Sequence, residues 1–142
     1  MTYDENNIFA KIIRGEAPAH IVEQDDACLT MMDIMPQSPG HTLVIPKEPA
    51  IDVFKVSDRG LEQVILQTRR VARAIDRVFE PDGVMLVQLN RSGAGQSVFH
   101  LHFHVIPRWG GLQMAFHSRD VEKSEILTEH ASKIRSALAE IV

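Results

Sequence analysis

Residues 100–108 read HLHFHVIPR, so histidines alternate with apolar side chains. Successive side chains of a β-strand point to opposite faces of the sheet, and this alternation is typical of a strand with one polar and one buried face. The histidines then share one face, about 6.6–7 Å apart along the strand. They are His100, His102 and His104. The apolar residues between them should pack into the core: Leu101, Phe103 and Val105.

The rest of the chain predicts an α+β fold, with an antiparallel sheet of about five strands. Short turns separate strands that follow one another, which favours antiparallel pairing. We expect strands at residues 20–24, 27–33, 41–45, 84–90 and 99–107. Ser57 is a good N-cap, and apolar residues at helical spacing predict a long helix from there to about residue 79. A short N-terminal helix and a C-terminal helix are expected at about residues 7–14 and 121–141.

Length, net charge and cysteine content indicate how many domains the chain has and which kinds of partner it is unsuited to bind. The length of 142 residues fits one domain over residues 1–142, and a net charge of -4 gives no footprint for a nucleic-acid backbone or an anionic membrane. Cys28 is the single cysteine, so no internal disulfide can form, which favours a cytoplasmic location. The N-terminus has no secretory signal pattern, and no stretch is long and apolar enough to span a membrane.

Three clustered histidines allow three interpretations. A plain polar strand face accommodates one or two histidines, but fits three in five residues badly. A metal site is a second possibility, because imidazole is a good zinc or iron ligand; His41, His117 and Cys28 are the further candidate donors. The third is phosphoryl chemistry, in which one neutral imidazole attacks phosphorus and the others donate hydrogen bonds to its oxygens.

The loop before the histidines favours the third interpretation. Residues 90–97 read NRSGAGQS. Glycines let backbone N–H groups approach a phosphate closely, and Gln96 and Ser97 add side-chain donors. A plain hairpin loop is the alternative. A donor-rich loop beside imidazoles suits an anion better than a cation.

The run GQSVFHLHFHVIPR, residues 95–108, resembles the signature of the histidine triad superfamily of nucleotide hydrolases and transferases. Residues 8–49, from IFAKII to VIPKEP, resemble the N-terminal half of the same family. Residues 109–142 match no branch closely and form a variable C-terminal region. The resemblance implies an HIT-like fold over one domain and a homodimer with the long helix at its interface.

The resemblance also implies roles for single residues. His102 matches the nucleophile, His104 the histidine that contacts the α-phosphate, and His100 and His41 the supporting histidines. Gly95, Gln96 and Ser97 match the loop that holds the phosphate and meets the leaving group, and Asn90 matches a residue on the phosphate side. Asp33 matches the acid that holds the ribose hydroxyls. The positions that line the purine pocket are Ile8, Phe9, Ile12, Ile34 and Leu43.

From the residues alone, several of these positions have simpler explanations. Asp33 would be a turn-forming aspartate before Met35 and Pro36, and Ile8, Phe9 and Ile12 would most often belong to the core. A purine pocket is lined by such residues anyway, so one side chain can serve both purposes.

The implied activity is hydrolysis of a nucleoside phosphoramidate or a dinucleoside polyphosphate at the α-phosphate. A covalent nucleotidyl-His102 would form, and an AMP- or GMP-like mononucleotide would be released without a cofactor. Residues 7–10 lack the Cys-x-x-Cys that holds zinc in many bacterial relatives, so we expect no metal. Two alternatives stay open. One is a nucleotide-binding scaffold with little turnover, and the other is a metalloprotein with the three histidines as ligands.

Overall fold

The computed structural model describes residues 1–111 and 120–141. One antiparallel sheet runs in the order β1-β2-β3-β5-β4, as the predicted α+β class requires. Its strands are β1 (Ile21–Gln24), β2 (Cys28–Met32), β3 (Thr42–Pro46), β4 (Gly83–Val87) and β5 (Phe103–Arg108). The helices are α1 (Ile8–Ile13), α2 (Asp58–Phe79) and α3 (Ser124–Glu140), with a short 3-10 turn η1 (Ser92–Ala94). Among the described residues, no helix is long and apolar enough to cross a membrane.

Helix α2 forms where the apolar periodicity and the capping residue predict it. The Ser57 hydroxyl accepts a hydrogen bond from the Gly60 N–H at 3.0 Å, which satisfies one of the unpaired donors of the first turn. Val64, Val71 and Ile75 recur on one face and are fully buried. The helix ends at Phe79, and its C-cap Glu80, with a left-handed φ of 45°, turns the chain toward Pro81.

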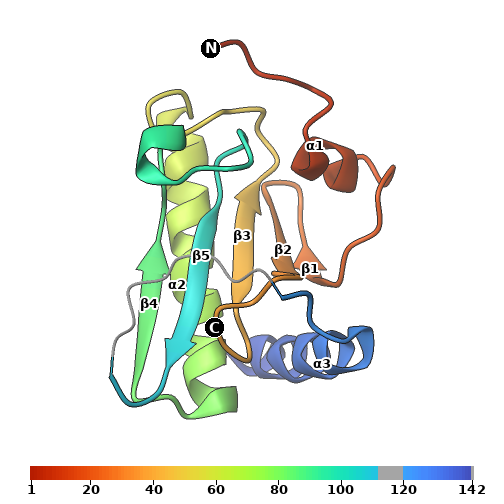
Figure 1. Cartoon of the computed structure of the whole chain (residues 1–142), viewed down its shortest axis with the longest axis vertical. Coiled ribbons are helices and arrows are strands. Elements are labelled where there is room, and N and C mark those ends of the chain that lie inside the picture. The colour runs from red at the N-terminus through yellow and green to blue at the C-terminus, as the bar shows by residue number, and fades with distance from the viewer. Residues whose placement is uncertain (112–119, 142) are drawn as a thin grey trace.

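Helices α2 and α3 cover one face of the sheet, and α2 lies behind it in Figure 1. The main core lies there, and side chains from both helices meet strand residues such as Val44 and Val105. Leu101 and Phe103 join this core, as the alternation of HLHFHVIPR predicts. Arg135 ties α3 to the edge of the sheet, because its guanidinium donates to the Val22 carbonyl at 2.6 Å.

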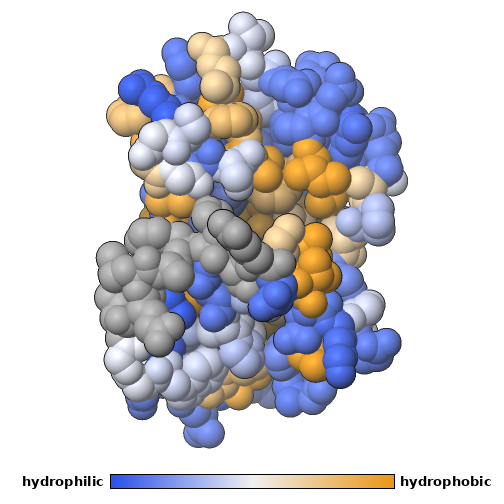
Figure 2. All heavy atoms as spheres, in the orientation of Figure 1, coloured by the Kyte–Doolittle hydropathy of each residue, from blue (hydrophilic) through white to orange (hydrophobic). Residues whose placement is uncertain are grey.

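The opposite face of the sheet carries a smaller apolar cluster under α1. It consists of Phe9, Ile12, Leu29, Met31, Leu43 and Ile45. Strand alternation extends this face to three polar residues, because Asp33 follows Met31, His41 precedes Leu43, and His104 pairs with Leu43 in the ladder. Figure 2 shows hydrophobic residues reaching the surface beside α1 on this side of the molecule.

The last strand begins later than the sequence pattern predicts. The pattern predicts a strand over residues 99–107, but β5 starts at Phe103 and the backbone bends at residues 98–100. The Leu101 N–H donates to the Ala50 carbonyl at 2.8 Å instead of to a ladder partner. His100 and His102 therefore lie in a bent approach to the sheet, while His104 lies within a strand. The other ends differ by a few residues: β4 stops at Val87, and α3 starts at Ser124.

Candidate active site

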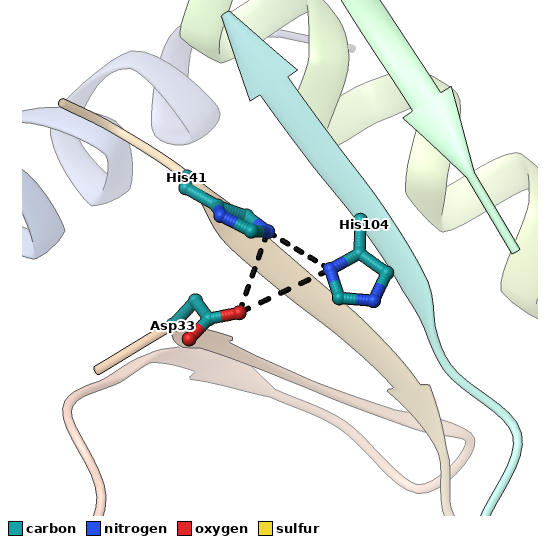
Figure 3. Close-up of side chains that lie close together, drawn as sticks. All are labelled: Asp33, His41 and His104. Carbon is teal, nitrogen blue, oxygen red and sulfur yellow. Dashed lines mark hydrogen bonds and ion pairs between the residues drawn. The ribbon is translucent and has the colours of Figure 1, made fainter. Parts of the chain in front are cut away.

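Three polar side chains meet at the ends of three strands (Figure 3). Asp33 follows β2, His41 precedes β3, and His104 lies on β5. His41 Nε2 is 2.9 Å from His104 Nδ1, and Asp33 Oδ2 is 3.4 Å and 3.9 Å from these two nitrogens. Both histidines are almost completely buried, and Asp33 keeps 17% of its side chain exposed. The cluster is a hydrogen-bonded network at the rim of the sheet.

The partners of His41 determine which of its nitrogens carries the proton. Its Nδ1 accepts the Gln37 backbone N–H at 3.0 Å, so Nδ1 is unprotonated and the proton lies on Nε2. Nε2–H then donates to His104 Nδ1, which leaves the proton of His104 on its own Nε2. His41 is therefore neutral, and its contact with Asp33 is a polar contact and not an ion pair. His104 Nε2–H is a donor of the kind that suits a phosphate oxygen.

A metal fits these three residues poorly, although their candidate ligand atoms lie within 4.8 Å of one another. To coordinate through Nε2, His41 would have to lose the Gln37 hydrogen bond or give up its last proton. Hydrogen bonding explains the same distances without that cost. Of the other donors that the sequence suggested, Cys28 lies in the core on the opposite face, and His117 falls outside the described residues.

His102 and His100 form a second hydrogen-bonded pair. His102 Nδ1 lies 2.6 Å from the His100 carbonyl oxygen, which can only accept, so Nδ1–H donates and Nε2 carries the lone pair. The His102 ring is 5.0 Å from that of His104 and 4.9 Å, edge to face, from that of Phe9. Phe9 and His104 thus hold the ring from two sides while its Nδ1 is anchored.

The His100 ring is turned toward a different set of partners. It is fully buried, and its Nε2–H donates to the Pro46 carbonyl at 2.7 Å. Its Nδ1 accepts the Tyr3 hydroxyl at 2.6 Å. Burial lowers the pKa of His100, which keeps the ring neutral. Both ring nitrogens are engaged in these bonds, which leaves His100 unsuited to a metal site shared with His102 and His104.

The glycine-containing loop is held by internal hydrogen bonds. The buried Gln96 amide donates to the Ile51 and Val98 carbonyls and accepts the Arg91 N–H. The N–H groups of Ala94, Gly95 and Gln96 donate to carbonyls within the loop. Gly95 has a φ of 102°, a conformation that favours glycine. Gln96 and Gly95 therefore shape the loop.

Asn90 and Ser97 have contrasting positions in the same loop. The Asn90 side chain accepts the Val53 N–H at 3.0 Å and exchanges hydrogen bonds with Gln88, so it ties the loop to residues 51–54. Ser97 is exposed and lies a few residues before His100. The Asn90 amide is occupied by these internal hydrogen bonds, whereas the exposed Ser97 hydroxyl can be reached by a ligand.

Most of the expected purine-pocket residues belong to the cluster under α1. Phe9, Ile12 and Leu43 are buried there. Ile8 and Ile34 are each 47% exposed, so these two offer apolar surface to a ligand. The Ile34 carbonyl also accepts the Glu122 N–H at 3.0 Å, which ties the C-terminal part of the chain to this loop.

Asp33 has the turn-forming contact that its sequence position predicts, and its second carboxylate oxygen faces the histidine network. Its Oδ1 accepts the Met35 N–H at 2.9 Å, as a turn-forming aspartate does. Its Oδ2 faces His41 and His104.

Among the described residues, two of the surface hollows lie outside this network. A hollow of about 270 Å³ is lined by Ser38, Arg108, Trp109 and Gly111, just beyond the end of β5. A larger one, of about 410 Å³, lies between the β1–β2 turn and α2, against the face that carries Cys28. The first borders the histidine side, because the Ser38 hydroxyl donates to the Pro107 carbonyl three residues after His104. The larger hollow is remote from the histidines, and we assign no chemistry to it.

Comparison with known proteins agrees with this geometry. Residues 14–111 match the model of the HIT domain. This chain belongs to the HIT family. A HIT-like protein of Bartonella henselae, solved with an unknown ligand and described as involved in cell-cycle regulation, is 44% identical. It superposes with a TM-score of 0.92 over 96% of this chain and 99% of its own.

Two further HIT structures carry functional descriptions. A hypothetical histidine triad nucleotide-binding protein of Sulfolobus tokodaii is 29% identical, with a TM-score of 0.85 over 93% of this chain and 91% of its own. A HIT family hydrolase of Legionella pneumophila is 36% identical, with a TM-score of 0.64 over 78% of this chain and 97% of its own. At the level of the family, this chain is therefore similar to nucleotide-binding and hydrolase proteins.

Sequence reasoning missed Tyr3 as a residue of the site. Its hydroxyl reaches His100 across 97 positions of the chain, and no motif near the N-terminus indicates such a contact. From its sequence, the segment before α1 is only a polar stretch that precedes a helix.

Proposed function

We propose that this HIT protein hydrolyses a nucleoside phosphoramidate or a dinucleoside polyphosphate at the α-phosphate, with His102 as nucleophile. The observation that carries the proposal is the 2.6 Å bond between His102 Nδ1 and the His100 carbonyl. Fixing the proton on Nδ1 gives Nε2 the lone pair that nucleophilic attack on phosphorus requires. The same bond stabilises the positive charge that the ring gains as it attacks.

In the first step His102 Nε2 forms a bond to the α-phosphorus, and the bond from phosphorus to the leaving nitrogen or oxygen breaks. The leaving group departs with that electron pair and takes up a proton from solvent. His104 Nε2–H donates to a non-bridging oxygen as negative charge develops there. Ser97, exposed before the histidines, is our candidate to contact the leaving group.

In the second step water attacks the phosphorus of nucleotidyl-His102 and releases one proton to solvent. The phosphorus–nitrogen bond breaks, His102 recovers its lone pair, and a nucleoside monophosphate leaves. The ring needs no second ionisable group to regain its tautomer, because its Nδ1–H remains bonded to the His100 carbonyl throughout. Burial of His102 and His104 strengthens each of these polar contacts by keeping bulk water away.

A purine nucleotide suits the surroundings. The exposed apolar side chains of Ile8 and Ile34 are the candidates to contact the base, with Phe9, Ile12 and Leu43 as the layer beneath them. Asp33 Oδ2 is the candidate acceptor for the ribose hydroxyls. AMP- and GMP-containing substrates both meet these requirements.

The test is turnover of adenosine phosphoramidate and of diadenosine tetraphosphate by the wild-type protein and by His102→Asn. We expect the variant to lose nearly all activity, and acid quenching of the wild-type reaction to trap an adenylyl group on His102, detected by peptide mass spectrometry. Wild-type turnover by His102→Asn would contradict the assignment of the nucleophile. A folded wild-type protein with no turnover but micromolar AMP binding would indicate a nucleotide-binding scaffold.

We also propose a homodimer built on α2 and β4. β4 is an edge strand, and large apolar side chains are exposed on both elements, with Ile65 at 41%, Leu66 at 56% and Leu86 at 47%. Exposed apolar side chains clustered on neighbouring elements are typical of protein–protein interfaces. Sedimentation velocity should give a dimer for the wild type and for Val121→Glu, and a monomer for Leu66→Glu. A monomeric wild type at micromolar concentration would overturn this proposal.

A further inference from the structure

Tyr3 lies against a residue of the site from the far end of the chain. Its hydroxyl is 2.6 Å from His100 Nδ1, and its ring meets the His100 ring edge to face, 5.6 Å between centroids and 63° between planes. Nε2–H of His100 is already used by the Pro46 carbonyl, so Nδ1 is the acceptor and the Tyr3 hydroxyl is the donor. The hydrogen bond therefore runs from the Tyr3 hydroxyl, as donor, to His100 Nδ1, as acceptor.

The backbone at His100 needs such an anchor. β5 begins at Phe103, so no sheet ladder holds residues 98–102 in place. The peptide between His100 and Leu101 is instead fixed by separate bonds. The Leu101 N–H donates to the Ala50 carbonyl, and the His100 carbonyl accepts His102 Nδ1–H.

The anchored carbonyl is the one that orients His102. The His100 side chain, held by Tyr3 and by the Pro46 carbonyl, restrains the backbone of its own residue; when one of these bonds is lost, the His100 carbonyl can shift, and the His102 Nδ1–H bond lengthens or bends. Hydrogen bonds weaken steeply with such misalignment. Tyr3 and the Pro46 carbonyl hold the His100 ring at its two nitrogens, so loss of either frees one side of the ring.

We propose that Tyr3 is a positioning residue for the nucleophile: its hydroxyl fixes the His100 ring, and through it the carbonyl that orients His102. The inference rests on the proposed function of His102. It adds a residue of the N-terminal segment, outside the histidine signature, to the site. The burial of His100 is consistent with this role, because a buried ring nitrogen without a donor would leave its polarity unsatisfied.

The experiment compares the wild type with Tyr3→Phe, which removes the hydroxyl and keeps the ring. We expect kcat on adenosine phosphoramidate to fall about three- to tenfold, the equivalent of one buried hydrogen bond, with KM changed by less than about twofold. In the protein labelled with ¹⁵N-histidine, we also expect the His102 Nδ1–H resonance to move. A role confined to holding the N-terminus in place would leave that resonance unchanged.

Asn7→Ala is the matched control. Asn7 Oδ1 accepts the Ala10 N–H at 2.9 Å, so its loss loosens the same segment without contacting His100. We expect Asn7→Ala to keep wild-type kcat and the wild-type His102 resonance. An equal fall in kcat for both variants, or unchanged kcat and resonance in Tyr3→Phe, overturns the proposal.

The two proposals fail separately. If the wild type shows no turnover on any substrate, the function of His102 is wrong, and the His102 resonance alone decides whether Tyr3 positions the ring. If the wild type forms adenylyl-His102 and Tyr3→Phe behaves like it in both measurements, only the role of Tyr3 is lost.

Discussion

His41 donates its Nε2 proton to His104 Nδ1 across 2.9 Å, and this bond sets the protonation of both rings. It does so because the Gln37 N–H occupies the other nitrogen of His41. His104 consequently carries its proton on Nε2, where it is a donor. His102 has the opposite arrangement, with the proton on Nδ1 and the lone pair on Nε2. Backbone hydrogen bonds therefore make Nε2 of His104 a hydrogen-bond donor and leave Nε2 of His102 with a lone pair.

Replacing His41 with Asn should lower kcat about tenfold with little change in KM. The variant loses the bond that orients His104, and one buried hydrogen bond corresponds to about a tenfold change in rate. Steady-state kinetics on adenosine phosphoramidate measures this. His20→Asn is the control, because His20 contacts Ser124 at 3.0 Å away from the network. Equal losses in the two variants would show that the effect is not specific to the site.

Asp33→Asn should weaken AMP binding about tenfold while leaving 2′,3′-dideoxy-AMP binding nearly unchanged. The amide oxygen can still accept the Met35 N–H, so the turn persists, while an NH2 group replaces the oxygen that faces His41 and that we propose accepts the ribose hydroxyls. Isothermal titration calorimetry on both nucleotides measures the difference. Equal weakening for the two ligands would rule out a contact with the ribose hydroxyls.

Gln96→Ala and Ser97→Ala should separate loop stability from chemistry. Gln96→Ala leaves the Ile51 and Val98 carbonyls and the Arg91 N–H without their partner, which should cost about 1–3 kcal/mol of unfolding free energy. Ser97 is exposed, so its replacement should change stability by less than about 0.5 kcal/mol and lower kcat instead. Urea unfolding and kinetics on both variants test this. A loss of stability in Ser97→Ala together with a loss of kcat alone in Gln96→Ala would contradict both assignments.

The free energy of unfolding should fall as the pH drops below about 6.5. Burial lowers the pKa of His100 and of His130 in the folded protein, so the unfolded chain binds protons that the folded chain resists. Arg14 lowers the pKa of Glu16, and Lys133 lowers that of Glu129. These carboxylates change the unfolding free energy only when the pH falls below their ordinary pKa of 4.5, so they do not contribute between pH 7.5 and 5.5. Urea midpoints at pH 7.5 and 5.5 measure the slope.

In His130→Gln the slope between pH 7.5 and 5.5 should shrink but not vanish, because the share of His100 remains. A stability that is flat or rises as the pH falls from 7.5 to 5.5 would contradict this prediction.

Local patterns predicted most of the secondary structure. The Ser57 cap, the apolar stripe of α2 and the burial of Leu101, Phe103 and Val105 all follow from side-chain periodicity and capping chemistry. The bend at residues 98–100 could not be predicted, because it depends on the Ala50 carbonyl that captures the Leu101 N–H. The position of β5 between β3 and β4 also depends on long-range pairing.

The sequence by itself determined that this protein has an α+β fold of the HIT type and a cluster of histidines beside a glycine-containing loop. Alternation along the chain is a local property, and the histidine signature lies within one short run of residues. Tertiary structure decided which nitrogen of each ring carries its proton, because this depends on which backbone or side-chain group the folded chain brings to each nitrogen. Gln37 decides it for His41, the His100 carbonyl for His102, and Tyr3 with Pro46 for His100.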